Sequence, residues 1–202
     1  MAQATFPLFG APLRKFSLCD AAKLTAATQL SFQQRACWYG SELASPWAAM
    51  RAGFTSGIGQ WANRPYVKGN DGDDYAQRFA VYYVRRSTRD AGELLAGYLN
   101  HEDPRFHPSG ETTTKKRVRS ALLSVLIARS DEGSNRVALE PIVGSLGSAF
   151  AGAACYREHT GTGYALRGAS LTYSSYFAKA LYKEFQPDIS FFVARKLHKK
   201  RD

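Results

Sequence analysis

Residues 137–156 read VALEPIVGSLGSAFAGAACY, an apolar stretch in which small residues recur and only Glu140 carries a charge. Small side chains recur three and four positions apart, at Gly144, Gly147, Ser148, Ala151, Gly152 and Cys155. In a helix these positions share one face, which would be nearly smooth. A smooth face lets a second helix approach backbone to backbone. The stretch therefore predicts a tightly packed helix whose contact residues are Gly144, Gly147, Ala151 and Gly152.

Two residues at the start of this stretch favour a buried helix over a membrane span. Glu140 and Pro141 are tolerated in the first turn of a helix, but they shorten the uncharged apolar segment. The chain has no uncharged apolar run of about eighteen residues, the length that a spanning helix needs. We therefore expect a packing helix. The sequence leaves open whether the helix against it belongs to the same chain or to a partner.

Helical periodicity extends over most of the chain after residue 17. Ser17 and Ser45 can cap two helices, and Pro46 suits a first helical position. Pro187 is expected to end one helix, with Asp188 capping the next. Strand signals are weak. The expected helices cover residues 17–39, 46–58, 75–100, 112–129, 137–156, 164–186 and 189 onward.

These helices predict an all-α fold with small-residue packing faces. We expect residues 1–202 to form a single compact domain of six or seven helices. Residues 1–16 are expected to be an extended arm, and residues 198–202 a frayed basic tail. The apolar content of 45% and the aromatic content of 13% suffice for a packed core without metals or disulfides.

The cysteines suggest no chemistry of their own. Cys19, Cys37 and Cys155 are an odd number and show no CxxC or Cys/His spacing. We therefore expect idle or buried thiols, with neither a disulfide framework nor a zinc site. No cofactor motif is present either, since the glycine-rich segments lack a preceding strand and the lysine of a phosphate-binding loop.

The chain is strongly basic, with 27 Lys and Arg against 17 Asp and Glu and a net charge of +10. This charge predicts attraction to polyanions. It affects how tightly a polyanion binds and does not indicate which polyanion is the partner. Two clusters are the candidate anion-binding residues: Lys115, Lys116, Arg117 and Arg119, and then Arg195, Lys196, Lys199, Lys200 and Arg201. The second cluster follows apolar residues, a distribution that suits an anionic membrane surface.

Residues 101–111 hold the densest group of acid, base and ligand side chains. His101, Asp103 and His107 are the weak catalytic candidates, with Glu102 and Glu111 beside them. Their spacing matches no metal or hydrolase motif, so no metal site is predicted. The simpler interpretation is a loop in which the carboxylates pair with Arg105 or cap the next helix.

From about Gly59 onward the chain resembles a family of uncharacterised bacterial proteins, many of them exported or envelope-associated. The elements that carry the resemblance are short: GQW at 59–61, YAQRF at 75–79, HEDPR at 101–105, the Gly/Ala-rich segment at 144–154 and EFQPDI at 184–189. The resemblance implies a compact helical body near a membrane, and it implies no reaction. Members of this family begin with a secretion leader, and the sequence shows none.

The sequence thus favours a non-enzymatic helical interaction or structural protein. We expect a membrane- or envelope-associated subunit, in a complex or an oligomer, that binds a protein partner or an anionic membrane surface. Its place would be the envelope, or the cytoplasm if no leader was removed. Two alternatives stay open: an enzyme that uses the 101–111 loop, and a nucleic-acid-binding protein that uses the basic helix 112–129.

Overall fold

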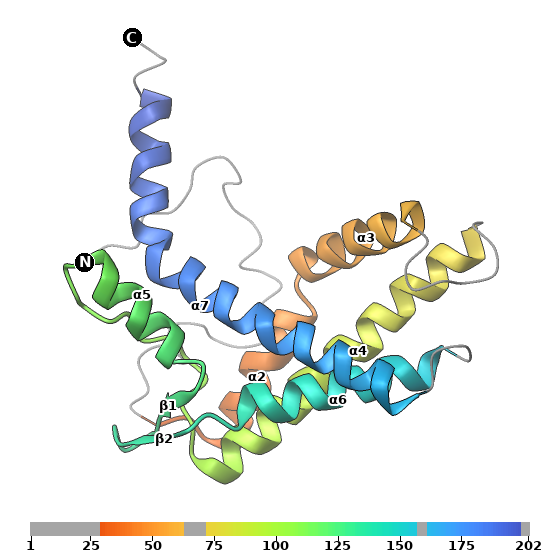
Figure 1. Ribbon diagram of the computed structural model, residues 1–202, viewed down its shortest axis with the longest axis horizontal. Coiled ribbons are helices and arrows are strands. Elements are labelled where there is room, and N and C mark those ends of the chain that lie inside the picture. Colours follow the sequence, from red (N-terminus) through yellow and green to blue (C-terminus); the bar gives the residue numbers. More distant parts are fainter. Residues whose placement is uncertain (1–28, 63–71, 157–160, 199–202) are drawn as a thin grey trace.

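The computed structural model describes residues 29–62, 72–156 and 161–198 (Figure 1). This part of the chain forms six helices and one antiparallel two-stranded sheet, which confirms the all-α fold class. In chain order the elements are α2 (Phe32–Leu43), α3 (Pro46–Trp61), α4 (Gly72–Asn100), α5 (Thr114–Leu123), β1 (Ile127–Arg129), β2 (Asn135–Val137), α6 (Glu140–Cys155) and α7 (Thr162–His198).

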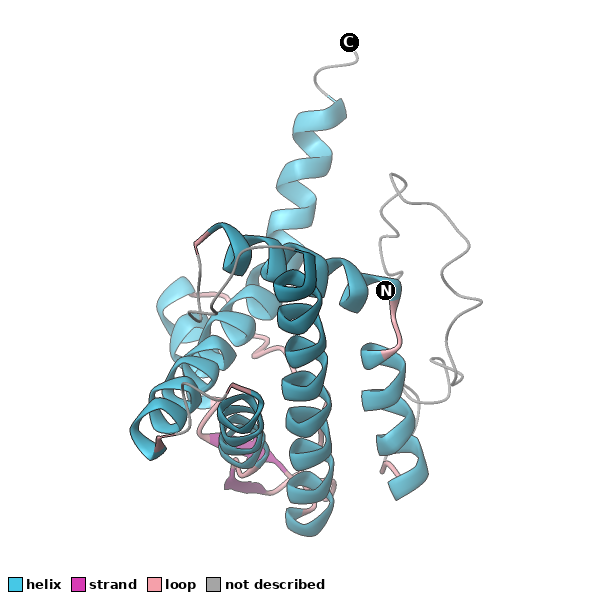
Figure 2. Ribbon diagram, turned by 90° about the vertical axis from the view of Figure 1, so that its right-hand side faces the viewer, coloured by secondary structure: helices cyan, strands magenta, loops and turns pink. Residues whose placement is uncertain are grey.

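The long helix α4 is the centre of the arrangement. Helices α2, α3 and α6 pack against it, while α7 packs against α6 and α5 packs against α7. Figure 1 shows α3 projecting away from α5 and α6, with α4 as its main contact, and Figure 2 shows the helices from the side. One face of α3 is therefore left without a neighbouring helix in the described chain.

The small-residue face of α6 packs against α4 of the same chain, which answers the question that the sequence left open. A Cβ atom built on Gly144 would lie 2.7 Å from Cγ of Glu93, and one on Gly152 would lie 2.8 Å from Cδ of Arg85. Gly147 lies opposite Thr88 at ordinary contact distance, 3.4 Å from its methyl carbon. As the numbers rise along α6 they fall along α4, so the two helices run antiparallel. Ala151 is only half-buried.

Helices α2 and α3 begin at serine side-chain caps. Ser45 caps α3 with Pro46 in the first turn, as the sequence predicts. The predicted helix 17–39 is interrupted: residues 29–31 are not helical, and α2 begins at Phe32, where Ser31 and Gln34 form a capping box. The predicted start at Ser17 lies outside the described residues. Residues 1–28, which include the predicted arm, lie outside the described residues.

The predicted helix 112–129 is also too long. Helix α5 ends at Leu123, and Ile127–Arg129 then pairs with Asn135–Val137 as a hairpin that the sequence analysis did not predict. The turn between the strands needs Gly133, whose φ of +83° suits glycine. This hairpin reverses the chain so that α6 can return along α4.

Pro187 does not end a helix, contrary to the expectation from sequence. Helix α7 continues through it to His198. A proline inside a helix removes one hydrogen bond and can bend the helix without breaking it. Figure 1 shows α7 changing direction in its C-terminal half, so that its last turns point away from the other helices. Residues 199–202, most of the predicted tail, lie outside the described residues.

The core of the described chain is built from small residues. Alanines make up most of its buried apolar side chains, including Ala52, Ala121, Ala149 and Ala165. Large apolar side chains instead lie outward on several helices, as on α6, where Ile142, Val143, Leu146 and Phe150 are exposed. Packing small residues inside lets the helices approach closely, and it leaves the larger apolar area on the surface.

Candidate functional site

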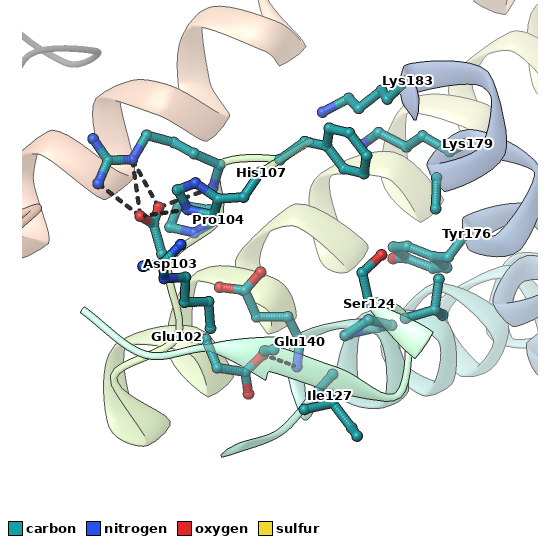
Figure 3. A pocket seen from close by; sticks show the side chains of 18 of the residues that line it. Glu102, Asp103, Pro104, His107, Ser124, Ile127, Glu140, Tyr176, Lys179 and Lys183 are labelled. Atoms are coloured by element: carbon teal, nitrogen blue, oxygen red, sulfur yellow. Dashed lines mark hydrogen bonds and ion pairs between the residues drawn. The ribbon is translucent and has the colours of Figure 1, made fainter. Parts of the chain in front are cut away.

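A polar pocket lies between helices α2, α4, α5, α6 and α7 and the loop that follows α4. Its volume of about 740 Å³ is within the range of small-molecule sites. Figure 3 shows Glu140 pointing into this space from α6, while Tyr176, Lys179 and Lys183 reach into it from α7. Charged groups from distant parts of the sequence thus meet at one place.

Two carboxyl groups at the inner end of the pocket are packed in the same way: each lies against a glycine of the opposite helix. Glu93 of α4 lies against Gly144 of α6, and Glu140 of α6 lies against Gly97 of α4. In each helix the glutamate precedes the glycine by four residues, so both belong to the same helical face. Since the helices are antiparallel, each glycine provides the room that the opposite glutamate fills. The repeated Glu-x3-Gly spacing is a sequence signal for this arrangement, and the sequence analysis missed it.

Each of these glutamates has a tyrosine as hydrogen-bond donor. The Tyr39 hydroxyl donates to Oε2 of Glu140 at 3.1 Å, and the Tyr176 hydroxyl donates to Oε1 of Glu93. Burial raises the pKa of Glu140 well above its usual range, and the nearby carboxylates of Glu102 and Glu93 raise it further. Burial also raises the pKa of Glu93. The inner end of the pocket therefore carries less negative charge than its residue types suggest.

A chain of ion pairs runs along α4 beside these carboxyl groups. Arg89 contacts Glu93 and Asp90, each at 3.2 Å. Arg86 bridges Asp90 at 2.8 Å and Glu42 of α2 at 2.9 Å. Buried ion pairs of this kind add little net stability, because desolvation offsets most of the attraction. Groups kept in a pocket at such a cost are typical of functional sites.

Two lysines on α7 complete the wall of the pocket. Lys179 and Lys183 are one helical turn apart, and neither forms an ion pair with any residue that the structure describes. The Lys183 ammonium lies 5.8 Å from the centre of the Phe106 ring. Burial lowers the pKa of Lys183, as does the neighbouring charge of Lys179. These cations differ from Arg86 and Arg89, whose charges are already paired.

The loop 101–111 is held by structural contacts. The carboxylate of Asp103 accepts hydrogen bonds from the backbone and side chain of Arg105 and lies 3.1 Å from the His107 ring. Glu102 is buried and accepts from the backbone N–H of Leu139 at 2.7 Å, which caps the start of α6. His101 is exposed in the left-handed conformation that ends α4. Asp103 and His107 line the pocket, and His101 does not.

No group of three or more potential metal ligands was found among the described residues. The carboxyl groups of Glu140, Glu93 and Asp90 instead contact tyrosine or arginine side chains of the same chain.

The predicted anion-binding residues differ in their availability. Arg117 contacts Asp188 at 2.6 Å and Glu184 at 3.2 Å, so its charge is used to join α5 to α7. Lys116 lies 3.7 Å from Glu111. Lys115 and Arg119 are exposed on α5, and Arg195 is exposed on α7. The side chain of Lys196 lies outside the described part, as do the residues Lys199, Lys200 and Arg201.

The cysteines differ from the expectation in one respect. Cys37 is held in a disulfide bond, whereas Cys155 is a free thiol. The expectation of idle thiols is therefore wrong for Cys37. The spacing rules that led to it apply to sites within one short segment, and a disulfide joins residues that only the folded chain brings together.

Comparison of the chain with models of protein families, with curated proteins and with solved structures finds no match. The function must therefore be inferred from the structure itself.

The two buried glutamates predict how stability changes with pH. Their pKa values are raised in the folded state, so the folded protein holds protons that the unfolded chain has already released. Between about pH 5 and pH 8 the free energy of unfolding is then expected to fall as the pH rises. Glu140→Gln removes one of these groups. We expect urea denaturation to give a smaller fall for this variant than for the wild type, by about 1.4 kcal/mol for each unit of pKa shift removed.

Glu132→Gln is the control, because Glu132 is an exposed glutamate in the β1–β2 turn. If the Glu140→Gln and wild-type stabilities stay parallel from about pH 5 to pH 8, Glu140 does not titrate in the way its burial indicates.

Proposed function

We propose that this protein is a non-enzymatic helical interaction protein that docks through α3 on an anionic membrane surface. The observation that carries the proposal is the orientation of α3. Its small residues Ala48, Ala52 and Ser56 face the rest of the protein, and its large apolar residues face outward. The outward residues recur every three or four positions, which makes them one stripe: Trp47, Met50, Phe54, Ile58 and Trp61.

The chemistry of this stripe suits the membrane interface. Phe54 is 72% exposed and Trp61 is 88% exposed, values that are costly in water for side chains of this size. Tryptophans stand at both ends of the stripe, and tryptophan is enriched at membrane–water interfaces. Helix α3 has no acidic residue, and its one charged side chain, Arg51, is exposed. The net charge of +10 adds attraction to anionic lipid.

Further observations support association with a membrane surface from outside the bilayer. Phe191 and Phe192 are exposed on the last turns of α7, close to Arg195. The disulfide of Cys37 is typical of proteins outside the reducing cytosol, which supports a place in the envelope. Among the described helices, none is both long and apolar enough to cross a membrane.

Vesicle flotation tests this function. Wild-type protein is expected to float with vesicles of phosphatidylglycerol and phosphatidylcholine, and far less with phosphatidylcholine alone, because charge attraction brings the protein to the surface. The variant Phe54→Ser/Trp61→Ser should lose about tenfold or more of its partitioning, since each aromatic side chain contributes apolar burial. Circular dichroism should show an unchanged helix content, because both side chains are mostly exposed.

The matched control is Leu171→Ser/Tyr182→Ser, which removes two other exposed apolar side chains from α7. Wild-type protein that stays unbound to anionic vesicles would contradict the proposal. Equal losses for the two double variants would show that the apolar surface acts without a specific role for α3. Dissociation of an oligomer by the α3 variant, without vesicle binding of the wild type, would assign the stripe to a second copy of the chain.

A further inference from the structure

The pocket between α4, α5 and α7 is lined by some cations that form no ion pair with the described residues. Arg86, Arg89 and Arg105 each form an ion pair with a carboxylate. Lys179 and Lys183 form none with the described residues, although both line the pocket. Two ammonium groups one helical turn apart repel each other, and a ligand with negative charge would relieve that repulsion.

A third cation faces the same space from another helix. Arg119 of α5 lines the pocket and forms no ion pair with the described part of the chain. Glu42, Glu93 and Glu140 also line the pocket, and the first two attract the lysines across it, so they offset part of this charge. Lys179, Lys183 and Arg119 still have no ion-pair partner in the described chain, and an anion could contact all three.

The shape of the pocket indicates the size of that anion. A volume of about 740 Å³ is far larger than an inorganic ion requires. Phe106 lies beside the lysine Lys183, and Leu123 and Tyr176 also line the pocket, so apolar surface is available next to the cations. The hydroxyl of Tyr176 and the carboxyl of Glu93 provide polar contacts at the inner end.

We propose that this pocket binds a small phosphate ester, with its phosphate between Lys179, Lys183 and Arg119 and its organic part directed inward. A phosphate monoester carries a charge of about −1.5 to −2 near neutral pH, which matches the two unpaired lysines. Lysine is a common phosphate ligand that acts as a point charge. The ester is either a free metabolite or the headgroup of an anionic lipid. The site does not depend on α3, none of whose residues lines the pocket.

Calorimetric titration with glycerol 3-phosphate tests the site, with glycerol as the uncharged comparison. The experiment should be run at about 150 mM salt, where attraction between exposed charges is largely screened. Wild-type protein is expected to show saturable binding of glycerol 3-phosphate and none of glycerol. The variant Lys179→Gln/Lys183→Gln should bind at least about tenfold more weakly, because it loses two charge-assisted contacts.

The control Lys115→Gln/Arg167→Gln removes the same amount of charge from two exposed positions that do not line the pocket. It should bind within about twofold of the wild type. If both double variants bound glycerol 3-phosphate equally weakly, the binding would depend on general charge attraction, and the proposed site would be wrong. Failure of the wild type to bind would overturn it as well.

Vesicles that contain phosphatidic acid separate the two sources of phosphate. Displacement of the protein from these vesicles by glycerol 3-phosphate, lost in Lys179→Gln/Lys183→Gln, would assign the site to a lipid headgroup. Binding in solution without such displacement would assign it to a free ester. The α3 variant Phe54→Ser/Trp61→Ser should keep its affinity for glycerol 3-phosphate, so the failure of one proposal is distinguishable from the failure of the other.

Discussion

Replacing Arg35 by methionine is expected to lower the free energy of unfolding by about 3–5 kcal/mol, the usual cost of breaking a buried ion pair from one side. Arg35 is 1% exposed. Its guanidinium contacts Asp131 at 2.6 Å and donates to the backbone carbonyl oxygens of Leu30 and Glu102. It also lies 3.9 Å from Glu140. One side chain therefore joins α2, the β1–β2 turn, the end of α4 and the start of α6.

The loss of stability arises mainly because the polar groups that contact Arg35 remain in place without it. Asp131 would keep its charge in a nearly buried place, and its Oδ1 atom already accepts no hydrogen bond from the described residues. Two buried carbonyl groups would lose a donor as well. Methionine has about the length of the arginine stem, so the variant tests the polar contacts more than the packing.

A double-mutant cycle with Asp131→Asn measures this effect. The variant Arg35→Met/Asp131→Asn should lose clearly less stability than the sum of the two single variants, since the uncompensated carboxylate is gone. Arg167→Met is the matched control on an exposed helix face and is expected to change stability by about 0.5 kcal/mol or less. Additive losses in chemical denaturation would show that Arg35 and Asp131 do not depend on each other.

Gly97→Ala is expected to destabilise the protein by about 2 kcal/mol or more, although alanine is the better helix former by about 1 kcal/mol. The added Cβ would lie 2.7 Å from Cδ and 2.9 Å from Cγ of Glu140. Cγ belongs to the stem of the Glu140 side chain, so moving only the carboxyl group would not relieve the overlap. The Glu140 side chain would have to move away from residue 97 and would lose its hydrogen bond with Tyr39.

The compensating variant is Gly97→Ala/Glu140→Ala, which removes the glutamate side chain that the new Cβ would overlap. We expect it to be more stable than the sum of the single effects predicts, because the overlap no longer exists. Gly57→Ala is the control, since no atom lies within 4 Å of a Cβ at this position in α3. It should be neutral or slightly stabilising in thermal denaturation. If Gly57→Ala lost as much stability as Gly97→Ala, contact between the added Cβ and Glu140 would not explain the effect at Gly97.

The failures of the sequence-based interpretation have identifiable physical causes. The predicted helix 17–39 is interrupted before α2, because Ser31 and Gln34 form a capping box that starts a helix at Phe32. The β1–β2 hairpin was missed since its strands have three residues each and gain stability only through contacts such as the pairing of Glu102 with Ser130. The prediction at Pro187 was wrong because the ion pairs of Arg117 with Glu184 and Asp188 hold the helix on both sides of the proline.

The candidate site was only partly predictable for a similar reason. The loop 101–111 was singled out by its composition, and two of its candidates, Asp103 and His107, do line the pocket. Lys179, Lys183, Glu93 and Tyr176 were not singled out, because each is an ordinary residue of an amphipathic helix until another helix is placed beside it. The spacing Glu-x3-Gly in two segments was a signal in the sequence for Glu93 and Glu140, and it did not extend to the residues of α7.

The sequence by itself determined that a helix with a smooth face lies within residues 137–156, where α6 spans Glu140–Cys155, since small side chains at helical spacing need no knowledge of their surroundings. It did not determine what that face meets. The tertiary structure decided that α4 covers it, that the glycines Gly97 and Gly144 make room for buried glutamates, and that the large apolar residues of α3 are left outside. Helical periodicity is a property of one segment, whereas the pairing of faces depends on close contacts between segments that are far apart in the chain.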